Sequence, residues 1–423
     1  MEVRDGYKLT EVGVIPSDWD AVMLDRVAKR GSGHTPDKKH PDYWNGDIRW
    51  ISLADSASLD RGFIDDTISK ITPEGIARSS AVLHPAGTVV LSRDAGVGKS
   101  GIMRTAMAVS QHFIAWRCGS GLDNHFLYYW LQAAKPQFEG IANGTTIKTI
   151  GLSYFRALKI PHPPHHEQRA IAAALSDVDA LLGGLDRLIA KKRDLKQAAM
   201  QQLLTGQSRL AGFAGDWKVK RLGDVGYTYG GLTGKTKADF GSGDGRYITF
   251  MNVMSNVVVD CRSFDRVRVA PTETQHRVMC GDLLFNGSSE TPQEVALCSI
   301  LTEAVPDLYL NSFCFGFRVR QGAEIDVLFL AYLIRSNVGR ELMKSLAQGS
   351  TRYNLSKSAL LDAILSLPSN DEQTAIATVL SDMDADLAAL EARREKTRAL
   401  KQVMMQELLT GRTRLVPAGG DDA

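Results

Sequence analysis

The sequence predicts an α+β protein with a pseudo-two-fold internal repeat, in which two mixed α/β heads are separated and held by two long antiparallel α-helices. Three observations predict this fold. Residues 167–210 match residues 372–415 without a gap, and 25 of the 44 aligned positions are identical. Apolar residues in both copies recur at alternating spacings of four and three, which is typical of helices that form a coiled coil. The intervening stretches hold β-branched and aromatic runs bounded by Gly and Pro, which is typical of short strands.

These patterns divide the chain into five parts, because 423 residues are too many for one ordinary core. We expect head 1 with an N-terminal entry segment in residues 1–160, a central spacer helix in 161–212, head 2 in 213–366, a C-terminal spacer helix in 367–415 and a disordered tail in 416–423.

The two spacer helices are the most strongly patterned elements. Pro163 and Pro164 precede the first helix, and Gly206 and Gly411 close the two copies where a left-handed cap is expected. About 38 residues per copy would give a length of roughly 57 Å. The predicted seams consist of Ile171, Leu175, Val178, Leu182, Leu185 and Ile189 in the first copy and Ile376, Leu380, Met383, Leu387 and Leu390 in the second. Two matching seams favour helices that pair with each other, although each helix could instead pack on its own head.

The heads repeat more faintly than the helices. Residues 84–93 resemble residues 279–288, both a turn followed by a strand-like apolar run, and residues 143–164 lie opposite residues 348–369. The helices have stayed alike while the heads have diverged. This pattern fits a protein that binds two different targets at a fixed separation.

Composition limits the function classes. A net charge of +2 predicts no general attraction to nucleic acid, so a DNA-binding surface would have to be a local patch. No apolar run reaches the roughly 18–20 residues that cross a bilayer, and the first residues do not resemble a signal peptide. The five cysteines contain no C-x-x-C pair, so we expect free thiols in the cytoplasm and no zinc site.

Several stretches resemble the specificity subunits of Type I restriction–modification enzymes. The likeness lies in "YKLTEVGVIPSDW" at 7–19, in "GSGHTPDKKHPDYWNGDIRWISLAD" at 31–55, and in "PHHEQRAIAAALSDVDALL" with "LKQAAMQQLLTG" and their second copies. It covers the chain from about Tyr7 to Leu415. Head 2 lacks the Tyr-Trp-Asn-Gly run and has "KADFGSGDG" at 237–245, which leaves the geometry of its loop open.

The resemblance implies a non-catalytic DNA-sequence-recognition subunit. Each head would be a target-recognition domain that reads one half of a split, asymmetric double-stranded DNA target, and the helices would set the gap. Two methyltransferase (M) subunits would dock on this frame; whether two restriction/translocase (R) subunits join them stays open. S-adenosylmethionine, ATP and Mg would be bound by those partners and none by this chain. The location would be the cytoplasm of a bacterial or archaeal cell.

The sequence leaves two other functions open. A self-contained DNA adenine methyltransferase is disfavoured, because "DFGSG" at 239–243 is only faintly like a methyl-donor loop and no [DNS]-P-P-[YFW] motif occurs. A two-headed coiled-coil adaptor between proteins would have the same architecture. It lacks only the family resemblance.

Two motifs suggest other chemistry. "DAGVGKSG" at 94–101 is similar to a phosphate-binding P-loop, but Arg93 stands where that motif requires glycine. We expect instead an exposed basic loop, which could face DNA or be an ordinary surface turn. "HPPHHE" at 162–167 holds three histidines, of which the adjacent two diverge on a helix, so a polar helix entry is favoured over a metal site.

Polar loop residues are the candidates for DNA contact, because they supply base contacts and phosphate anchors. The candidates in head 1 are His34, Thr35, Arg93, Lys99, Ser100, Thr145, Thr146 and Lys148. The candidates in head 2 are Lys235, Thr236, Asn286, Ser288, Ser289, Thr351, Arg352 and Tyr353. Trp44 and Trp50 could be stacking platforms, but Trp50 lies in a strand-like run and is expected in the core.

If the helices set the gap, inserting one helical turn of about four residues after Leu195 should lengthen the unread spacer between the half-sites. Mapping of methylated sites before and after the insertion measures this gap. An unchanged gap would contradict the measuring role of the helices.

Overall fold

The computed structural model describes residues 4–142, 144 and 148–416. The predicted contact residues Thr145 and Thr146 and the predicted tail from 417 on lie outside the described residues. The chain forms two compact units. Unit 1 contains the residues up to Asp186 together with those from Ala392 on, and unit 2 is Arg187–Glu391. Each unit holds one head and half of each long helix.

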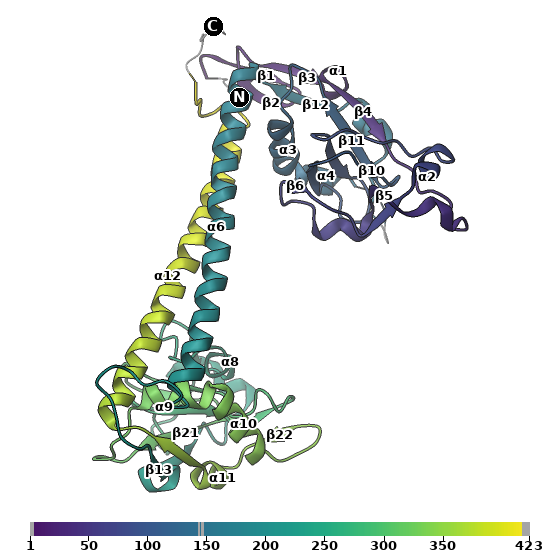
Figure 1. The fold of residues 1–423 in the computed structure, drawn as a ribbon. Helices are drawn as coiled ribbons and strands as arrows, with labels where there is room; N and C mark the ends of the chain where they lie inside the picture. The colour runs from purple at the N-terminus through teal and green to yellow at the C-terminus, as the bar shows by residue number, and fades with distance from the viewer. Residues whose placement is uncertain (1–3, 143, 145–147, 417–423) are drawn as a thin grey trace. The chain divides into compact units, whose positions relative to one another are not determined.

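Unit 1 contains head 1 as two main sheets (Figure 1). One has the order β4-β11-β8-β9-β6 and the other β10-β5-β7. The strands are β1 (Tyr7–Thr10), β2 (Gly13–Pro16), β3 (Asp20–Met23), β4 (Ala28–Ser32), β5 (Trp44–Ile51), β6 (Phe63–Ile64), β7 (Ser69–Ile71), β8 (Val89–Ser92), β9 (Ser100–Met103), β10 (Ala108–Val109), β11 (Phe113–Cys118) and β12 (Lys159–His162). The short helices are α1 (Leu24–Val27), α2 (Pro73–Ala77), α3 (Asn124–Ala133), α4 (Lys135–Ile141) and α5 (Leu152–Arg156).

Unit 2 contains head 2, with sheets of order β14-β21-β17-β19 and β16-β15-β20. The strands are β13 (Lys218–Arg221), β14 (Gly226–Gly230), β15 (Phe240–Ile248), β16 (Phe264–Val267), β17 (Leu283–Asn286), β18 (Ser288–Ser289), β19 (Cys298–Ile300), β20 (Leu308–Leu310), β21 (Cys314–Val319), β22 (Tyr353–Asn354) and β23 (Ile364–Leu367). The short helices are α7 (Leu222–Val225), α8 (Phe250–Ser255), α9 (Val327–Arg335), α10 (Asn337–Leu346) and α11 (Lys357–Asp362).

The loop whose geometry the sequence left open in head 2 matches its counterpart in head 1. In β5 the pairing with β7 shifts between Trp44 and Ile48, both of which face Ile71. In β15 the pairing with β16 shifts in the same way between Phe240 and Gly245, both of which face Val267. The bulge is therefore retained although the Tyr-Trp-Asn-Gly run is absent.

The two predicted spacer helices are present, each with 39 residues. They are α6 (His165–Leu203) and α12 (Asn370–Leu408). Gly206 and Gly411 have φ values of 71° and 68° and so lie in the left-handed region. The predicted glycine caps are confirmed, since an L side chain is disfavoured at this φ.

In unit 1 the two helices run antiparallel (Figure 1). Three ion pairs fix the direction: Asp179 pairs with Lys401 at 2.6 Å, Asp186 pairs with Arg394 at 3.4 Å, and Glu167 pairs with Arg414, just past the helix end. As the residue number rises on α6, that of the partner falls.

The same order holds within unit 2. Lys192 pairs with Asp386 at 2.9 Å, Lys196 pairs with Asp384, and Arg209 pairs with Glu372. The buried seam residues include Ile171, Leu175, Leu185, Ile189, Ile376, Leu380 and Leu387. Pairing of the helices is therefore confirmed within each unit, in place of the alternative that each packs on its head alone.

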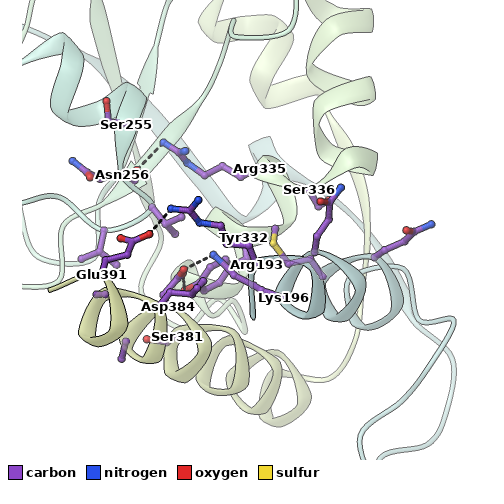
Figure 2. A pocket seen from close by; sticks show the side chains of 18 of the residues that line it. Arg193, Lys196, Ser255, Asn256, Tyr332, Arg335, Ser336, Ser381, Asp384 and Glu391 are labelled. Carbon is purple, nitrogen blue, oxygen red and sulfur yellow. Dashed lines mark hydrogen bonds and ion pairs between the residues drawn. The ribbon is translucent and has the colours of Figure 1, made fainter. Parts of the chain in front are cut away.

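A tyrosine of each head binds both helices. In unit 2 the hydroxyl of Tyr332 donates to Asp384 of α12 at 2.7 Å, and the ammonium of Lys196 on α6 lies 5.5 Å from the Tyr332 ring centre (Figure 2). The equivalent groups of unit 1 are Tyr129, Asp179 and Lys401, with a hydrogen bond of 2.9 Å and a ring distance of 5.4 Å. Each head is thus fixed on its own pair of helical segments.

The start of α6 carries two fully buried polar side chains, Glu167 and Gln168. Glu167 accepts from the indole N–H of Trp19 at 2.9 Å and from the guanidinium of Arg414 at 2.6 Å. Gln168 accepts from the backbone N–H of Asp123 at 2.9 Å. These bonds satisfy polar groups that would be costly to bury unpaired, and they tie the helix to three distant segments.

The cores of both heads extend onto the long helices. Ile171 and Leu175 belong to the main core of unit 1, and Ile376 and Leu380 to that of unit 2. Trp50 is buried, which confirms its predicted core position. Within the described part of the chain, no helix combines the length and apolar character that a membrane span requires.

Glu167→Ala should destabilise unit 1 by about 3 kcal/mol, because it leaves the buried indole of Trp19 unpaired and the guanidinium of Arg414 with Asp18 as its remaining partner. Urea unfolding followed by fluorescence measures the loss. The control Asp386→Ala removes an exposed pair with Lys192 and should cost less than about 1 kcal/mol. Equal effects of both variants would contradict the structural role of Glu167.

Candidate nucleic-acid interface

Two segments of head 1 meet where β8 ends. The backbone N–H of Arg93 donates to the carbonyl of His112 at 2.9 Å, and the backbone N–H of Ile150 donates to the carbonyl of Arg93 at 3.0 Å. Arg93 therefore stands between the residue that precedes β11 and the segment that carries Lys148. Lys148 is exposed beside it.

Side chains around this point form the head-1 loop cluster, defined as Thr35, Arg93, Asp94, Gln111 and His112. The hydroxyl of Thr35 donates to the side-chain oxygen of Gln111 at 2.5 Å. The Gln111 Nε2 atom lies 3.4 Å from His112 Nε2, and His112 Nδ1 lies 2.7 Å from Asp94 Oδ2. Arg93 Nε lies 3.7 Å from Asp94 Oδ1. The structure thus brings two of the predicted contact residues, Thr35 and Arg93, into one polar network.

The predicted contact residue His34 is exposed at the edge of this network. Its carbonyl accepts from the indole N–H of Trp50 at 3.0 Å. The ring of Trp44 stands edge-on to Trp50 with 5.1 Å between centres. Trp50 therefore holds the loop in place from below rather than presenting a stacking face.

The expected exposed basic loop is exposed only in part. Ser100 begins β9, is fully buried, and lies 2.7 Å from the side-chain nitrogen of Gln132, so its predicted exposure is wrong. Lys99 is half-buried and donates to the carbonyl of Ser56 at 3.2 Å. The physical reason is that β9 lies inside the sheet, between β8 and β6. The loop joins two strands, whereas a P-loop leads into a helix.

Head 2 repeats this backbone arrangement. The backbone N–H of Gly287 donates to the carbonyl of Phe313 at 2.9 Å, and that of Leu355 donates to the carbonyl of Gly287 at 3.0 Å. Gly287 follows β17 as Arg93 follows β8, and Phe313 precedes β21 as His112 precedes β11.

The side chains at this point form the head-2 loop cluster, defined as Phe313, Thr351, Arg352 and Tyr353. Phe313 is 60% exposed, and the guanidinium of Arg352 lies 5.8 Å from its ring centre. Thr351 and Arg352 are exposed and Tyr353 is half-buried. Three predicted contact residues therefore lie together on an accessible loop, next to an aromatic ring.

Three other candidates in head 2 face inwards. Asn286 is fully buried and its amide donates to the carbonyl of Glu294 at 2.9 Å. Ser289 is buried and its hydroxyl donates to the carboxylate of Glu294 at 3.2 Å. Ser288 is buried in β18. The loop after β17 folds back on itself, so its small polar residues hold the loop instead of facing outwards.

Lys235 and Thr236 are also engaged within head 2. The Lys235 side chain is 4% exposed, forms an ion pair with Glu273 and donates to the carbonyl of Arg268 at 2.6 Å. The hydrogen bond from Lys235 lowers the pKa of Glu273 to about 2. Thr236 is exposed, with its hydroxyl bonded to Asp239 at 2.8 Å.

Gln111, His112 and Phe313 were missed because no motif marks them. The one available signal was position: all three come immediately before the strand that pairs with the aligned run 84–93 or 279–288. That signal requires the strand pairing, which the sequence does not give.

The described residues show no group of three His, Cys, Asp or Glu side chains that could hold a metal ion. Unit 2 has a groove of about 890 Å³ between head 2 and its helical segments (Figure 2). Its charges are largely paired, Arg193 with Glu391 and Lys196 with Asp384. Burial raises the pKa of Tyr332, and its hydrogen bond to Asp384 adds to this shift. The hydroxyl therefore stays protonated as a donor.

Two unlike loop clusters on one repeated framework define a recognition protein with two different binding ends. A family model for the Type I restriction modification DNA specificity domain matches residues 16–190 and 214–399. The chain therefore belongs to this family. It is the non-catalytic DNA-recognition subunit of a type I restriction–modification system, and neither a self-contained methyltransferase nor a protein adaptor is favoured.

Similar proteins agree in length and fold. The MjaVIII specificity subunit of Methanocaldococcus jannaschii is 23% identical over 95% of this chain and 94% of its own length. The MjaIX specificity subunit of the same organism is 27% identical over 52% of this chain and 54% of its own. The crystal structure of the type I system S subunit from M. genitalium shares the fold with a TM-score of 0.56 and 15% identity, covering 96% of this chain and 98% of that one.

DNA binding can be tested at Arg352 of the head-2 loop cluster and at Lys148, which lies two residues before the partner of Arg93, Ile150. If DNA is bound there, Lys148→Ala and Arg352→Ala should each weaken binding on all sequences and lower the salt slope by about one unit, because each loses one phosphate contact. Titrations of duplex DNA at several salt concentrations measure the slope. The control Lys191→Ala removes an exposed charge on α6 and should leave the slope unchanged. An unchanged slope for both loop variants would place the interface elsewhere.

Proposed function

We propose that each head reads one half of a bipartite DNA target through its loop cluster. The observation that carries this proposal is the common backbone frame beneath two different sets of side chains. The bonds from Arg93 to His112 and from Gly287 to Phe313 are both 2.9 Å long. The equal backbone supports the same task, DNA reading, for both loop clusters. The different side chains support a different base sequence for each. The target is accordingly asymmetric as well as split.

The predicted contact residues that we propose at the DNA are exposed or partly exposed in the structure. They are His34, Thr35, Arg93 and Lys148 in head 1 and Thr236, Thr351, Arg352 and Tyr353 in head 2. Arginine and lysine would bind phosphates or guanines, and the hydroxyls would bind phosphates or base edges.

We further propose that the paired helices set the gap between the half-sites. Each unit supports this role with buried seam residues and with charged pairs in antiparallel order, such as Asp179 with Lys401 and Lys196 with Asp384. A helical pair of this kind resists bending better than a loop would.

Two methyltransferase subunits, one for each unit, are the proposed partners. A groove lies at the equivalent helix end of both units. In unit 2 it measures about 510 Å³ and is lined by Leu204 and Thr205, and in unit 1 about 630 Å³, lined by Leu409 and Thr410. Because the two grooves lie at equivalent helix ends, each would bind one copy of the same methyltransferase subunit. Restriction subunits would join the complex through the methyltransferase subunits. S-adenosylmethionine, ATP and Mg would be bound by these partners, and the complex would act in the cytoplasm.

Exchanging residues 20–160 for the corresponding head of a relative with a different target should change one half-site only, because head 2 keeps its own readers. Sequencing of methylated sites identifies both halves. The reciprocal exchange of residues 213–366 is the control and should change the other half. A change in both halves after either exchange would refute independent reading.

A further inference from the structure

The two residues that precede β11 in head 1 and β21 in head 2 differ in kind, although the backbone around them is the same. In head 1 the two residues before β11 are Gln111 and His112, and in head 2 those before β21 are Ser312 and Phe313. The strands that follow pair alike, since Phe113 faces Ser92 and Cys314 faces Asn286 at the same step of each sheet. The difference therefore lies in the side chains alone.

We propose that these two residues form a base-reading site in each head, that Gln111 at the first position reads an adenine through its amide, and that Phe313 at the second position reads a thymine through the 5-methyl group of the base. The inference rests on the proposed function, in which the loop clusters face DNA. Gln111 and Phe313 would be the residues that contact the bases, and their different chemistry would make the two half-sites different.

The amide of Gln111 is held ready for a base. Because the carboxylate of Asp94 accepts from His112 Nδ1, the proton of a neutral His112 lies on Nδ1 and its Nε2 is an acceptor. That acceptor faces Gln111 Nε2, while the hydroxyl of Thr35 donates to Gln111 Oε1. Both neighbours fix the same amide orientation.

This orientation leaves one N–H and one oxygen lone pair of Gln111 unused by these neighbours. The pair matches the N7 acceptor and the N6 donor of adenine in the major groove. Gln111 is exposed, so the base can approach. His112 is a positioning residue that acts through Gln111.

Phe313 offers a different chemistry in head 2, at the second position of the pair, where head 1 has His112. Its ring is 60% exposed, whereas the next residue, Cys314, is buried. A ring this exposed adds little to the core, so folding does not account for it. Apolar side chains recognise thymine by contact with its methyl group, and the neighbouring Arg352 supplies a charge for the adjacent phosphate.

The test uses the full chain in complex with its methyltransferase subunit and randomised duplex DNA as the probe. Selection with the unaltered complex gives the two half-sites. Gln111→Ala should relax one adenine position in one half-site by about 5- to 150-fold, the range of a bidentate contact. Phe313→Ala should relax one thymine position in the other half-site by about fourfold, the value of one buried methyl group.

Chemical substitution in the DNA tests the atoms involved. With 7-deazaadenine at the Gln111 position, binding of the unaltered complex should fall while that of Gln111→Ala should not. With deoxyuridine at the Phe313 position, binding of the unaltered complex should fall while that of Phe313→Ala should not. His112→Ala should weaken the same adenine preference and leave the salt slope unchanged. A loss of folding would instead also lower the salt slope, because the phosphate contacts would be lost.

Matched variants keep the result decisive if an alanine variant folds poorly. Gln111→Glu loses the N–H donor but keeps the shape and should also lose the adenine preference, whereas Phe313→Leu keeps an apolar contact and should retain the thymine preference. Failure of the unaltered complex to select a split target would overturn the proposed function. A split target that neither Gln111→Ala nor Phe313→Ala alters, or alters in both halves, would overturn this inference alone.

Discussion

The buried carboxylate at the start of each long helix is the interaction on which the rest of the structure depends. Glu167 binds Arg414 beyond the end of α12, and Glu372 binds Arg209 beyond the end of α6. Each pair joins the beginning of one helix to the end of the other, which only an antiparallel arrangement in one register allows. Removing Glu167 would leave Arg414 with Asp18 alone, and removing Glu372 would take from Arg209 its ion-pair partner. The register of the helices is therefore fixed at chemically identical points in the two units.

Contacts between the helices and the heads explain why the sequences of the two helices repeat closely while those of the heads do not. A helix residue in each unit contacts both the head and the other helix, as Asp179 and Asp384 do through a tyrosine and a lysine. A substitution there disturbs several contacts at once. A loop residue such as Gln111 or Phe313 is exposed, so it can change with little effect on folding.

The long helices, their caps and their seams were predictable because they depend on periodicity and on glycine, both visible in the sequence. The heads were predictable only as strand-rich domains. Ser100 and Asn286 illustrate what was missing: each is a polar residue at one end of a strand and next to a turn, yet each is buried, as is every residue of its strand. Lys235 is bound to Glu273, which lies far along the chain. Residue type identifies a possible DNA contact, but only strand order and side-chain direction separate contacts from internal bonds.

The main-chain bonds of the loop clusters bear on how such a protein changes its DNA target. The backbone of each loop cluster is held by main-chain bonds, from Arg93 to His112 and from Gly287 to Phe313, that do not depend on side-chain identity. One of the two residues before the strand can therefore be amide-bearing, as Gln111 is, or aromatic, as Phe313 is, without moving the loop. Specificity then changes by substitution at a fixed point instead of by rebuilding the head, and the helices continue to hold the frame unchanged.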